Sequence, residues 1–207
     1  MSVFEEISAA LQQGKADEVK SLVDGTLKAG SEPKTVLEEG LIAGMNVIGG
    51  KFKRNEIYIP EVLIAARAMH AGMSVLEPLL AAGGVKMAGK LVIGTVKGDL
   101  HDIGKNLVGM MFKGAGFEVV DLGTDVAPEQ FVEAAADADI IGLSALLTTT
   151  MTQMKSVIDA LKEKGSAVRV IVGGAPLTQS FADEIGAHGY APDAATAVEI
   201  GKALVGA

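Results

Sequence analysis

The chain has 207 residues, of which 49% are hydrophobic and 21% charged, a composition typical of a folded protein with one large domain or two smaller ones. The net charge is -8 without a basic cluster, and no apolar run reaches the roughly 20 residues that cross a bilayer, which argues against nucleic acid and membranes as partners. The chain has no cysteine, which excludes disulfides, zinc–thiolate sites and iron–sulfur clusters and favours a cytoplasmic location.

The first 88 residues carry only helical patterns. Apolar residues recur at helical spacing over residues 4–13, 16–29, 32–52 and 60–80, and glycines or polar turns separate these stretches. Ser31 is the expected N-cap of the third helix, with Pro33 in its first turn. Four antiparallel helices of this length predict a compact bundle. Residues 81–89 are rich in glycine and alanine and lack apolar periodicity, so they are the expected linker.

The pattern changes to alternating strands and helices after the linker. Strands are expected at residues 91–96, 117–122, 140–144, 168–172 and near 189–190, and helices at 102–113, 128–137, 150–164, 179–185 and 194–204. Five such units predict a parallel sheet covered by helices on both faces, and the apolar strand cores fit this. We therefore expect an α/β protein with an N-terminal four-helix bundle cap (1–88) and a flavodoxin-like, Rossmann-like five-stranded parallel sheet domain (89–207).

A glycine-punctuated loop follows the first expected strand, where open α/β sheets place their ligands. It carries His101, with Asp99 two residues before it and Asp102 directly after it. A loop can turn a histidine outward while a neighbouring carboxylate holds the other ring nitrogen, as metal-ligating histidines usually require. A strand–loop–helix unit can also carry these residue types by chance, so composition alone leaves both interpretations open.

Two further loops should converge on the same sheet edge, after the third and fourth strands. They carry Ser144-Ala145-Leu146, a run of threonines at 148–150, and Gly173-Gly174. Each is weak evidence alone, because a glycine pair is common at a strand end and the threonines could cap the next helix.

Taken together, Asp99-x-His101-x-x-Gly104, Ser144-x-Leu146 and Gly173-Gly174 resemble the ordered motifs of cobalamin-binding domains of the methionine synthase and corrinoid-protein type. The helical segment is also similar to the cap of that family, at residues 44–49 and 58–60. The resemblance covers nearly the whole chain.

The resemblance implies that cobalamin binds with its own base detached and His101 as the lower ligand of cobalt. Asp99 would orient the imidazole, and Thr150 would extend this relay, which would help protonation when His101 leaves Co(I). Small residues would leave room for the detached nucleotide tail, and Tyr58 would shield the upper corrin face. The cofactor-binding residues implied in this way are Gly98, Asp99, His101, Asp102, Ile103, Gly104, Ser144, Leu146, Thr148, Thr150, Gly173, Gly174, Tyr190, Ala194 and Tyr58, with His101 as the metal ligand.

The resemblance further implies a methyl carrier, with methylcobalamin and the Co(I) corrinoid as working forms and without a complete active site of its own. A substrate-specific methyltransferase would load it from a methylamine, methanol or aryl methyl ether. A second methyltransferase would pass the methyl group to tetrahydrofolate or coenzyme M, and a reductive activase would be a further partner. The cap would swing aside on residues 81–89. The alternatives are a cobalamin-binding regulator or sensor, a mutase-type cobalamin subunit, and a receiver-like domain without cobalamin.

Overall fold

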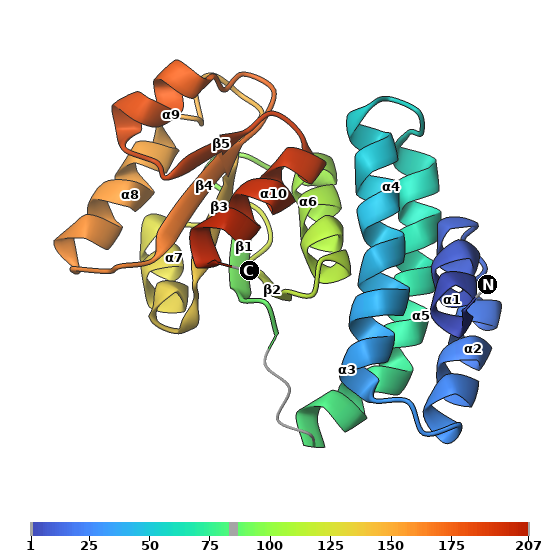
Figure 1. Cartoon of the computed structure of the whole chain (residues 1–207). Coiled ribbons are helices and arrows are strands. Elements are labelled where there is room, and N and C mark those ends of the chain that lie inside the picture. The colour runs from blue at the N-terminus through green and yellow to red at the C-terminus, as the bar shows by residue number, and fades with distance from the viewer. Residues whose placement is uncertain (1, 83–86, 207) are drawn as a thin grey trace. The chain divides into compact units, whose positions relative to one another are not determined.

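A computed structural model describes residues 2–82 and 87–206, which divide into a helical unit and an α/β unit (Figure 1). The expected linker at 81–89 includes residues 83–86, which lie outside the described residues. The hinge and the domain boundary at residue 88 therefore stay predictions. The predicted fold class, a helical bundle followed by a five-stranded parallel sheet, is confirmed.

The helical unit consists of four helical rods. Ser2 caps the first rod through a capping box with Glu5, in which each side chain accepts the backbone N–H of the other residue. The rods are α1 (Val3–Gln12), α2 (Ala16–Lys28), a continuous third rod made of α3 (Pro33–Thr35), the π-helical η1 (Val36–Ile42) and α4 (Ala43–Lys53), and α5 (Ile59–Ala82).

The third rod differs from the sequence prediction at its start. Its N-cap is Glu32, and the prediction of Ser31 is wrong. The N–H of Ser31 donates to the carbonyl of Thr26 at 3.2 Å, and that of Gly30 donates to Leu27 at 3.0 Å. These are the two hydrogen bonds of a Schellman motif, so Ser31 closes the end of α2 and does not begin the next helix.

The helix α5 is long and apolar enough, over Ile59–Leu80, to cross a membrane by length and composition alone. The sequence prediction counted only uninterrupted apolar runs, and charged residues such as Arg67 interrupt this one. Val62, Met69 and Leu76 are buried at helical spacing, and α5 packs against α2. An apolar stripe with exposed residues on the other face is the pattern of a helix that packs in a bundle.

The α/β unit contains five parallel strands in the order β2-β1-β3-β4-β5, which is the flavodoxin-like order. The strands are β1 (Lys90–Thr95), β2 (Glu118–Asp121), β3 (Ile140–Ser144), β4 (Arg169–Gly173) and β5 (Gly189–Ala191). The helices are α6 (Ile103–Gly114), α7 (Pro128–Ala134) with the 3₁₀ turn η2 (Ala135–Asp137), α8 (Gln153–Glu163), α9 (Gln179–Ile185) and α10 (Ala194–Val205).

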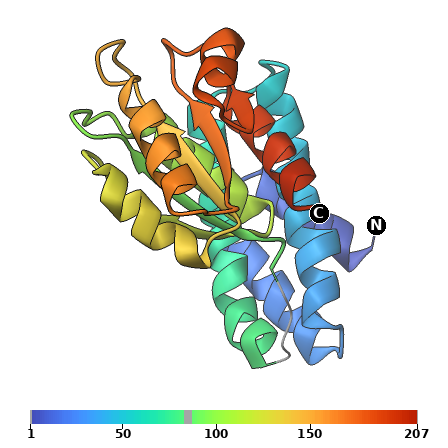
Figure 2. The ribbon, with the colours of Figure 1, turned by 90° about the vertical axis from the view of Figure 1, so that its left-hand side faces the viewer.

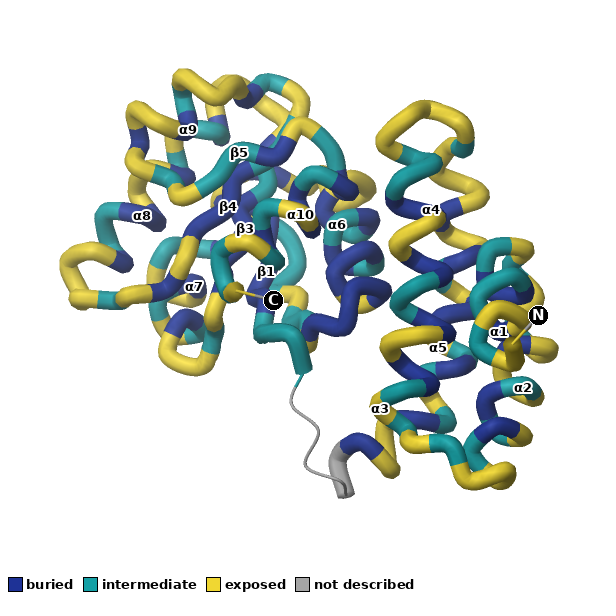
Figure 3. The backbone as a smooth tube through the Cα atoms, viewed as in Figure 1, coloured by how far each residue is buried: buried dark blue, intermediate teal, exposed yellow. Residues whose placement is uncertain are grey.

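Helices cover both faces of the sheet (Figures 1 and 2). On one face α6 and α10 lie together, and a Cβ atom at Gly201 of α10 would collide with the ring of Phe112 of α6. On the other face lie α7, α8 and α9, and Phe131 of α7 packs directly on Gly94 of β1. The middle residues of the three central strands β1, β3 and β4 are buried, as Figure 3 shows in dark blue. This double cover explains why the strand sequences are continuously apolar.

The carboxyl ends of the three central strands are in register. Thr95, the last residue of β1, pairs with Ser144, the last residue of β3, which in turn pairs with Gly173, the last residue of β4. The loops that leave these strands therefore begin side by side. We call them the β1 loop (residues 96–102), the β3 loop (145–152) and the β4 loop (174–178), and the β2 loop is residues 122–127.

Candidate functional site

The β1 loop opens with a tight turn that brings Asp99 back into the protein. The N–H of Asp99 donates to the carbonyl of Val96 at 3.1 Å, and Gly98 between them has a φ of 82°. A positive φ at the third position is the requirement of a type II turn, and glycine meets it without strain. The turn places the Asp99 side chain in a fully buried position.

The Asp99 carboxylate joins the β1 and β3 loops. Its Oδ1 accepts hydrogen bonds from the N–H of His101 at 3.1 Å and from His101 Nδ1 at 2.7 Å. Its Oδ2 accepts from the N–H groups of Leu146 and Leu147 at 2.8 and 3.3 Å, and from the hydroxyl of Thr150 at 2.6 Å. A buried carboxylate with this many donors is fully satisfied, and it fixes both loops at once.

These hydrogen bonds keep Asp99 ionised. Burial by itself raises the pKa of the carboxyl group, but the Thr150 hydroxyl, the Leu146 N–H, and the N–H and imidazole of His101 outweigh it. The pKa of Asp99 therefore lies well below its usual range, because all these donors favour the charged form.

The state of Asp99 determines which nitrogen of His101 is free. An ionised carboxylate can only accept, so Nδ1 of His101 carries the hydrogen that it donates to Asp99. In a neutral imidazole this leaves a lone pair on Nε2. The His101 side chain is 51% exposed while that of Asp99 is 0% exposed. The imidazole is therefore anchored to a buried carboxylate and is itself open to a ligand. Nε2 of His101 is thus open to a ligand while Nδ1 is anchored by Asp99, an arrangement typical of metal-binding histidines.

The surroundings of His101 fit a flat, largely apolar ligand. Leu100 and Ile103 are 73% and 75% exposed, and Leu146 and Leu147 are 42% exposed each. Three of these exposed side chains lie on the β1 and β3 loops that Asp99 joins, and Ile103 lies at the start of α6. Exposed large apolar side chains that gather at one site usually mark a binding surface, and we call these four the apolar patch. Imidazole nitrogen is a suitable ligand for the cobalt of a corrin, so His101 would be able to hold it. The donor set and the patch therefore fit a cobalamin.

The three glycines predicted at positions 104, 173 and 174 differ in whether the fold itself requires glycine there. A Cβ atom at Gly104 would meet nothing within 4 Å, so the chain itself does not require glycine there and the space stays open for a ligand. Gly174 has a φ of 141°, and a Cβ atom would overlap the carbonyl oxygen of Ala145. A Cβ atom at Gly173 would lie 3.1 Å from the carbonyl oxygen of Ala191. The fold alone therefore accounts for Gly174, whatever it contributes to binding.

The other predicted site residues of the α/β unit lie in the loops at the carboxyl ends of the strands or directly beside them, and their contacts differ. Asp102 accepts a hydrogen bond from the Asn106 side chain at 3.0 Å, which fixes the start of α6. Thr148 is exposed in the β3 loop, and Ser144 ends β3. The Tyr190 hydroxyl donates to the carbonyl of Leu177 at 3.0 Å, which ties β5 to the β4 loop.

Two further residues were named in the prediction. Ala194 is buried at the first turn of α10. Tyr58 belongs to the helical unit and is 66% exposed. The threonine run 148–150 does not cap α8, because that helix begins at Gln153 after Thr152. The Thr150 hydroxyl instead donates a hydrogen bond to Asp99.

Sequence reasoning missed several residues that hold the β1 loop or the start of α6. The buried Thr95 hydroxyl donates to the carbonyl of His101 at 2.8 Å. Lys105, also buried, donates to the carboxylate of Asp121 and to the Asn106 side chain. Asp125 contacts Gly98 and Asp99 from the β2 loop. The available sequence signal was a lysine directly after Gly104 of the motif, whereas Thr95 and Asp125 can be recognised only from the fold.

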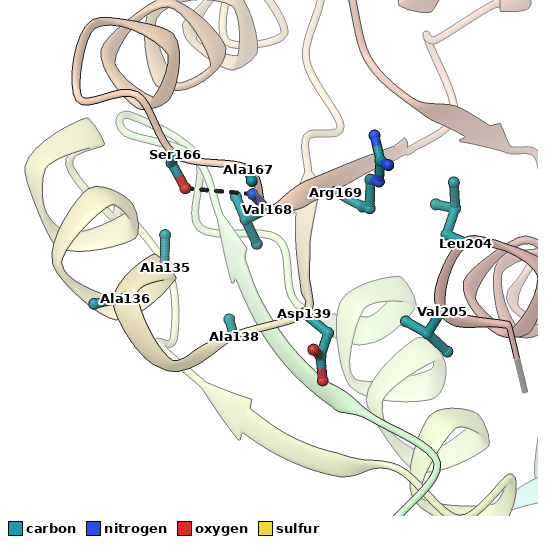
Figure 4. A pocket seen from close by; sticks show the side chains of 10 residues that line it. All are labelled: Ala135, Ala136, Ala138, Asp139, Ser166, Ala167, Val168, Arg169, Leu204 and Val205. Atoms are coloured by element: carbon teal, nitrogen blue, oxygen red, sulfur yellow. Dashed lines mark hydrogen bonds between the residues drawn. The ribbon is translucent and has the colours of Figure 1, made fainter.

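A separate pocket of about 510 Å³ lies at the opposite, amino-terminal edge of the sheet (Figure 4). It lies between η2, the starts of β3 and β4 and the end of α10, and Asp139 and Arg169 are its charged residues. No residue of the predicted site lines it. The lining residues are Ala135, Ala136, Ala138, Asp139, Ser166, Ala167, Val168, Arg169, Leu204 and Val205.

Comparison with known proteins finds similarity along the whole chain. Two family profiles, both described as B12 binding domain, match residues 89–199 and 3–77. A corrinoid protein of Desulfitobacterium hafniense is 44% identical over 213 residues, which is 100% of this chain and 99% of the relative. A dimethylamine corrinoid protein of Methanosarcina acetivorans is 47% identical over 208 residues, 98% of this chain and 96% of the relative.

A similar fold is also known from a crystal structure. The methanol:cobalamin methyltransferase complex MtaBC from Methanosarcina barkeri contains a chain that is similar with a TM-score of 0.87 and 31% sequence identity. The match covers 99% of this chain and 80% of that chain.

Proposed function

Because this chain belongs to the corrinoid proteins of methyltransferase systems, we propose that it holds cobalamin through His101 and carries a methyl group between two methyltransferases. When bound, cobalamin supplies a cobalt atom that takes up a methyl cation equivalent with its own electron pair and keeps that pair when the methyl group leaves. The observation that carries the proposal is the anchored imidazole of His101, whose Nδ1–H donates to Asp99 at 2.7 Å while half of the side chain is exposed.

In this proposal His101 binds cobalt through Nε2 with the cofactor's own base detached. Asp99 orients the ring and raises its donor strength, because the hydrogen bond to Nδ1 places negative charge on the far side of the imidazole. Thr150 and the backbone N–H groups of the β3 loop position Asp99 in turn. Gly98, Ser144, Thr148, Gly173, Tyr190 and Ala194 would border the detached nucleotide tail, and Tyr58 would belong to the cap.

The hydrogen bonds of Asp99 indicate where the Asp99–His101 pair would hold a proton when His101 is not bound to a metal. The relay was expected to carry protonation through Asp99. The carboxylate already accepts five hydrogen bonds and its pKa is lowered, so it stays ionised. The proton would therefore be held at Nε2 of His101, and Asp99 would stabilise the resulting charge.

The partners in the proposal are a substrate-specific methyltransferase, a second methyltransferase that uses tetrahydrofolate or coenzyme M, and a reductive activase. A methylated amine is the favoured methyl donor, since relatives named as dimethylamine corrinoid proteins are 47% identical to this chain. We place the protein in the cytoplasm, which the absence of cysteine favours.

The test is the absorption spectrum of the protein refolded with hydroxocobalamin. We expect stoichiometric corrin bands with the signature of a histidine-ligated, base-off cofactor in the unaltered protein, and a loss of that signature in His101→Ala. His70→Ala is the matched control, since His70 is exposed on α5 and its replacement should leave the spectrum unchanged. An unchanged spectrum in His101→Ala, or a protein that remains colourless, would refute the proposal.

A further inference from the structure

The β2 loop runs beside the β1 loop beyond the ends of their strands. The N–H of Thr95 donates to the carbonyl of Gly123 at 3.0 Å, and the N–H of Val126 donates back to Thr95 at 3.0 Å. Val96 and Val126 then form an isolated parallel bridge. The backbone of the β2 loop is therefore in place to hold the turn that carries Asp99.

Asp125 is the residue of the β2 loop whose side chain forms a hydrogen bond to this turn. Its Oδ1 accepts the N–H of Gly98 at 2.7 Å, and its own N–H donates to the carbonyl of Asp99 at 3.0 Å. The two hydrogen bonds hold the Gly98–Asp99 segment at both of its ends.

Asp125 adopts a backbone conformation that suits this role and few residue types. Its φ is 55°, in the left-handed region, and among the described residues Asn55 is the only other non-glycine residue with a positive φ. Asp and Asn tolerate this region better than other side chains, because their short polar groups hydrogen-bond locally. A residue that combines left-handed backbone with a side-chain acceptor is needed at this position.

We propose that Asp125 is a positioning residue for His101, an inference that rests on the proposed role of His101 as the cobalt ligand. The β3 loop holds the carboxylate of Asp99, and Asp125 holds its backbone. With both ends fixed, the direction from Asp99 Oδ1 to His101 Nδ1 is fixed, and so is the direction in which Nε2 points. Asp125 itself is exposed, so its side chain supports the loop and fills no space in the core.

Variants of Asp125 distinguish the effect of its side-chain acceptor from the effect of its left-handed backbone conformation. Asp125→Asn keeps a side-chain oxygen and tolerates the left-handed region, so it should behave as the unaltered protein. Asp125→Gly keeps the backbone conformation and loses the acceptor. Asn55→Gly is the control, since it makes the same kind of change at the other left-handed residue, in the helical unit. If Asp125→Gly does not fold, as judged by circular dichroism, Asp125→Ala, which also lacks a side-chain acceptor, takes its place.

Two readouts use protein labelled with ¹⁵N-histidine. Nitrogen NMR of the cofactor-free protein gives the fraction of His101 with the hydrogen on Nδ1. Electron paramagnetic resonance of the cobalamin-loaded protein, reduced to Co(II), gives the axial ligand: ¹⁵N from His101 splits each line into a doublet, and the cofactor's own ¹⁴N base would give a triplet.

We expect Asp125→Gly to lower the equilibrium constant for the Nδ1–H form and for histidine ligation by about three- to ten-fold, the factor of one hydrogen bond. Asp125→Asn and Asn55→Gly should change neither. Values for Asp125→Gly equal to those of the unaltered protein would overturn the proposal, and so would equal losses in Asp125→Asn. A triplet in the unaltered protein would instead refute ligation by His101, and the NMR readout would then still decide whether Asp125 positions the imidazole.

Discussion

At the scale of single residues, the buried charge of Asp99 makes the stability of the cofactor-free protein depend on pH. Its pKa in the folded state is lowered, whereas the unfolded chain has an aspartate pKa of about 3.9. The stabilisation is therefore complete above about pH 4 and is lost as the pH falls toward the folded-state pKa. We expect the free energy of unfolding in urea to decrease over this range, and to decrease less in Asp99→Asn, whose amide does not titrate.

Near neutral pH the same variant should be less stable by about 1–3 kcal/mol, because its amide leaves buried donors of the β3 loop without an acceptor. Asp159→Asn, on the exposed side of α8, is the control and should keep the pH profile of the unaltered protein. A profile for Asp99→Asn as steep as that of the unaltered protein would show that another group causes the acid sensitivity.

The sequence indicated only the local part of this site. Asp99 and His101 are two residues apart, so their hydrogen bond could be expected from spacing and loop position. The N–H groups of Leu146 and Leu147 are 47 and 48 residues away from Asp99, and backbone groups carry no sequence signal. Thr150 came from the family resemblance, and its contact with Asp99 exists because β1 and β3 are neighbours in the sheet.

At the scale of secondary-structure elements, glycine at position 104, in the first turn of α6, makes that helix less stable than alanine would. A Cβ atom there meets nothing, and its φ is not positive, so Gly104→Ala should raise the stability of the cofactor-free protein by up to about 1 kcal/mol. The same methyl group would occupy space proposed for the cofactor and weaken cobalamin binding by about ten-fold, as overpacking does.

Gly109→Ala, in the same helix, is the matched control for that change. Its Cβ would lie 3.7 Å from Cγ1 of Val119, an ordinary contact, so it should stabilise the protein without weakening cobalamin binding. Thermal unfolding and titration with hydroxocobalamin measure the two effects. Equal cobalamin affinity in both variants would mean that the cofactor does not approach Gly104.

The sequence predicted helices and strands correctly where apolar residues recur at a regular spacing. It predicted the residues at which these elements begin and end less accurately. The third rod shows the limit: Val36–Ile42 is π-helical, and Gly40 within it lies so close to Ile7 of α1 that a Cβ atom would be 3.0 Å from Cγ2. Only the packing of α1 reveals this contact. The start of α8 at Gln153 was likewise misplaced at Thr150, because the Thr150 hydroxyl serves Asp99 and does not cap the helix.

At the scale of the whole molecule, the two edges of the sheet should be functionally independent. Arg169 lies at the amino-terminal edge, beside the pocket in Figure 4, and the cobalamin site is proposed at the carboxyl edge. We expect Arg169→Ala to change the dissociation constant for hydroxocobalamin by no more than about two-fold, because distant sites without shared partners contribute independently. A change of about ten-fold or more in that titration would contradict this independence.

The fold class followed from the sequence, because alternating apolar strands and helices require parallel pairing with crossover helices. Family membership, inferred from three ordered motifs, is confirmed by matches in both halves of the chain. The amino-edge pocket could not be foreseen: residues 135–139, 166–169 and 204–205 come from distant segments and share no motif.

The bridge that Asp99 makes between the β1 and β3 loops has a consequence for how the cofactor would be taken up. Ordering one loop residue costs about 1–2 kcal/mol of conformational entropy, and a receptor assembled on binding would lose this from its affinity. The hydrogen bonds that join the two loops are made by groups of the protein itself, so that loss occurs during folding. The site is preorganised, and capture of the cofactor should resemble entry into a formed receptor more than closure of two mobile segments.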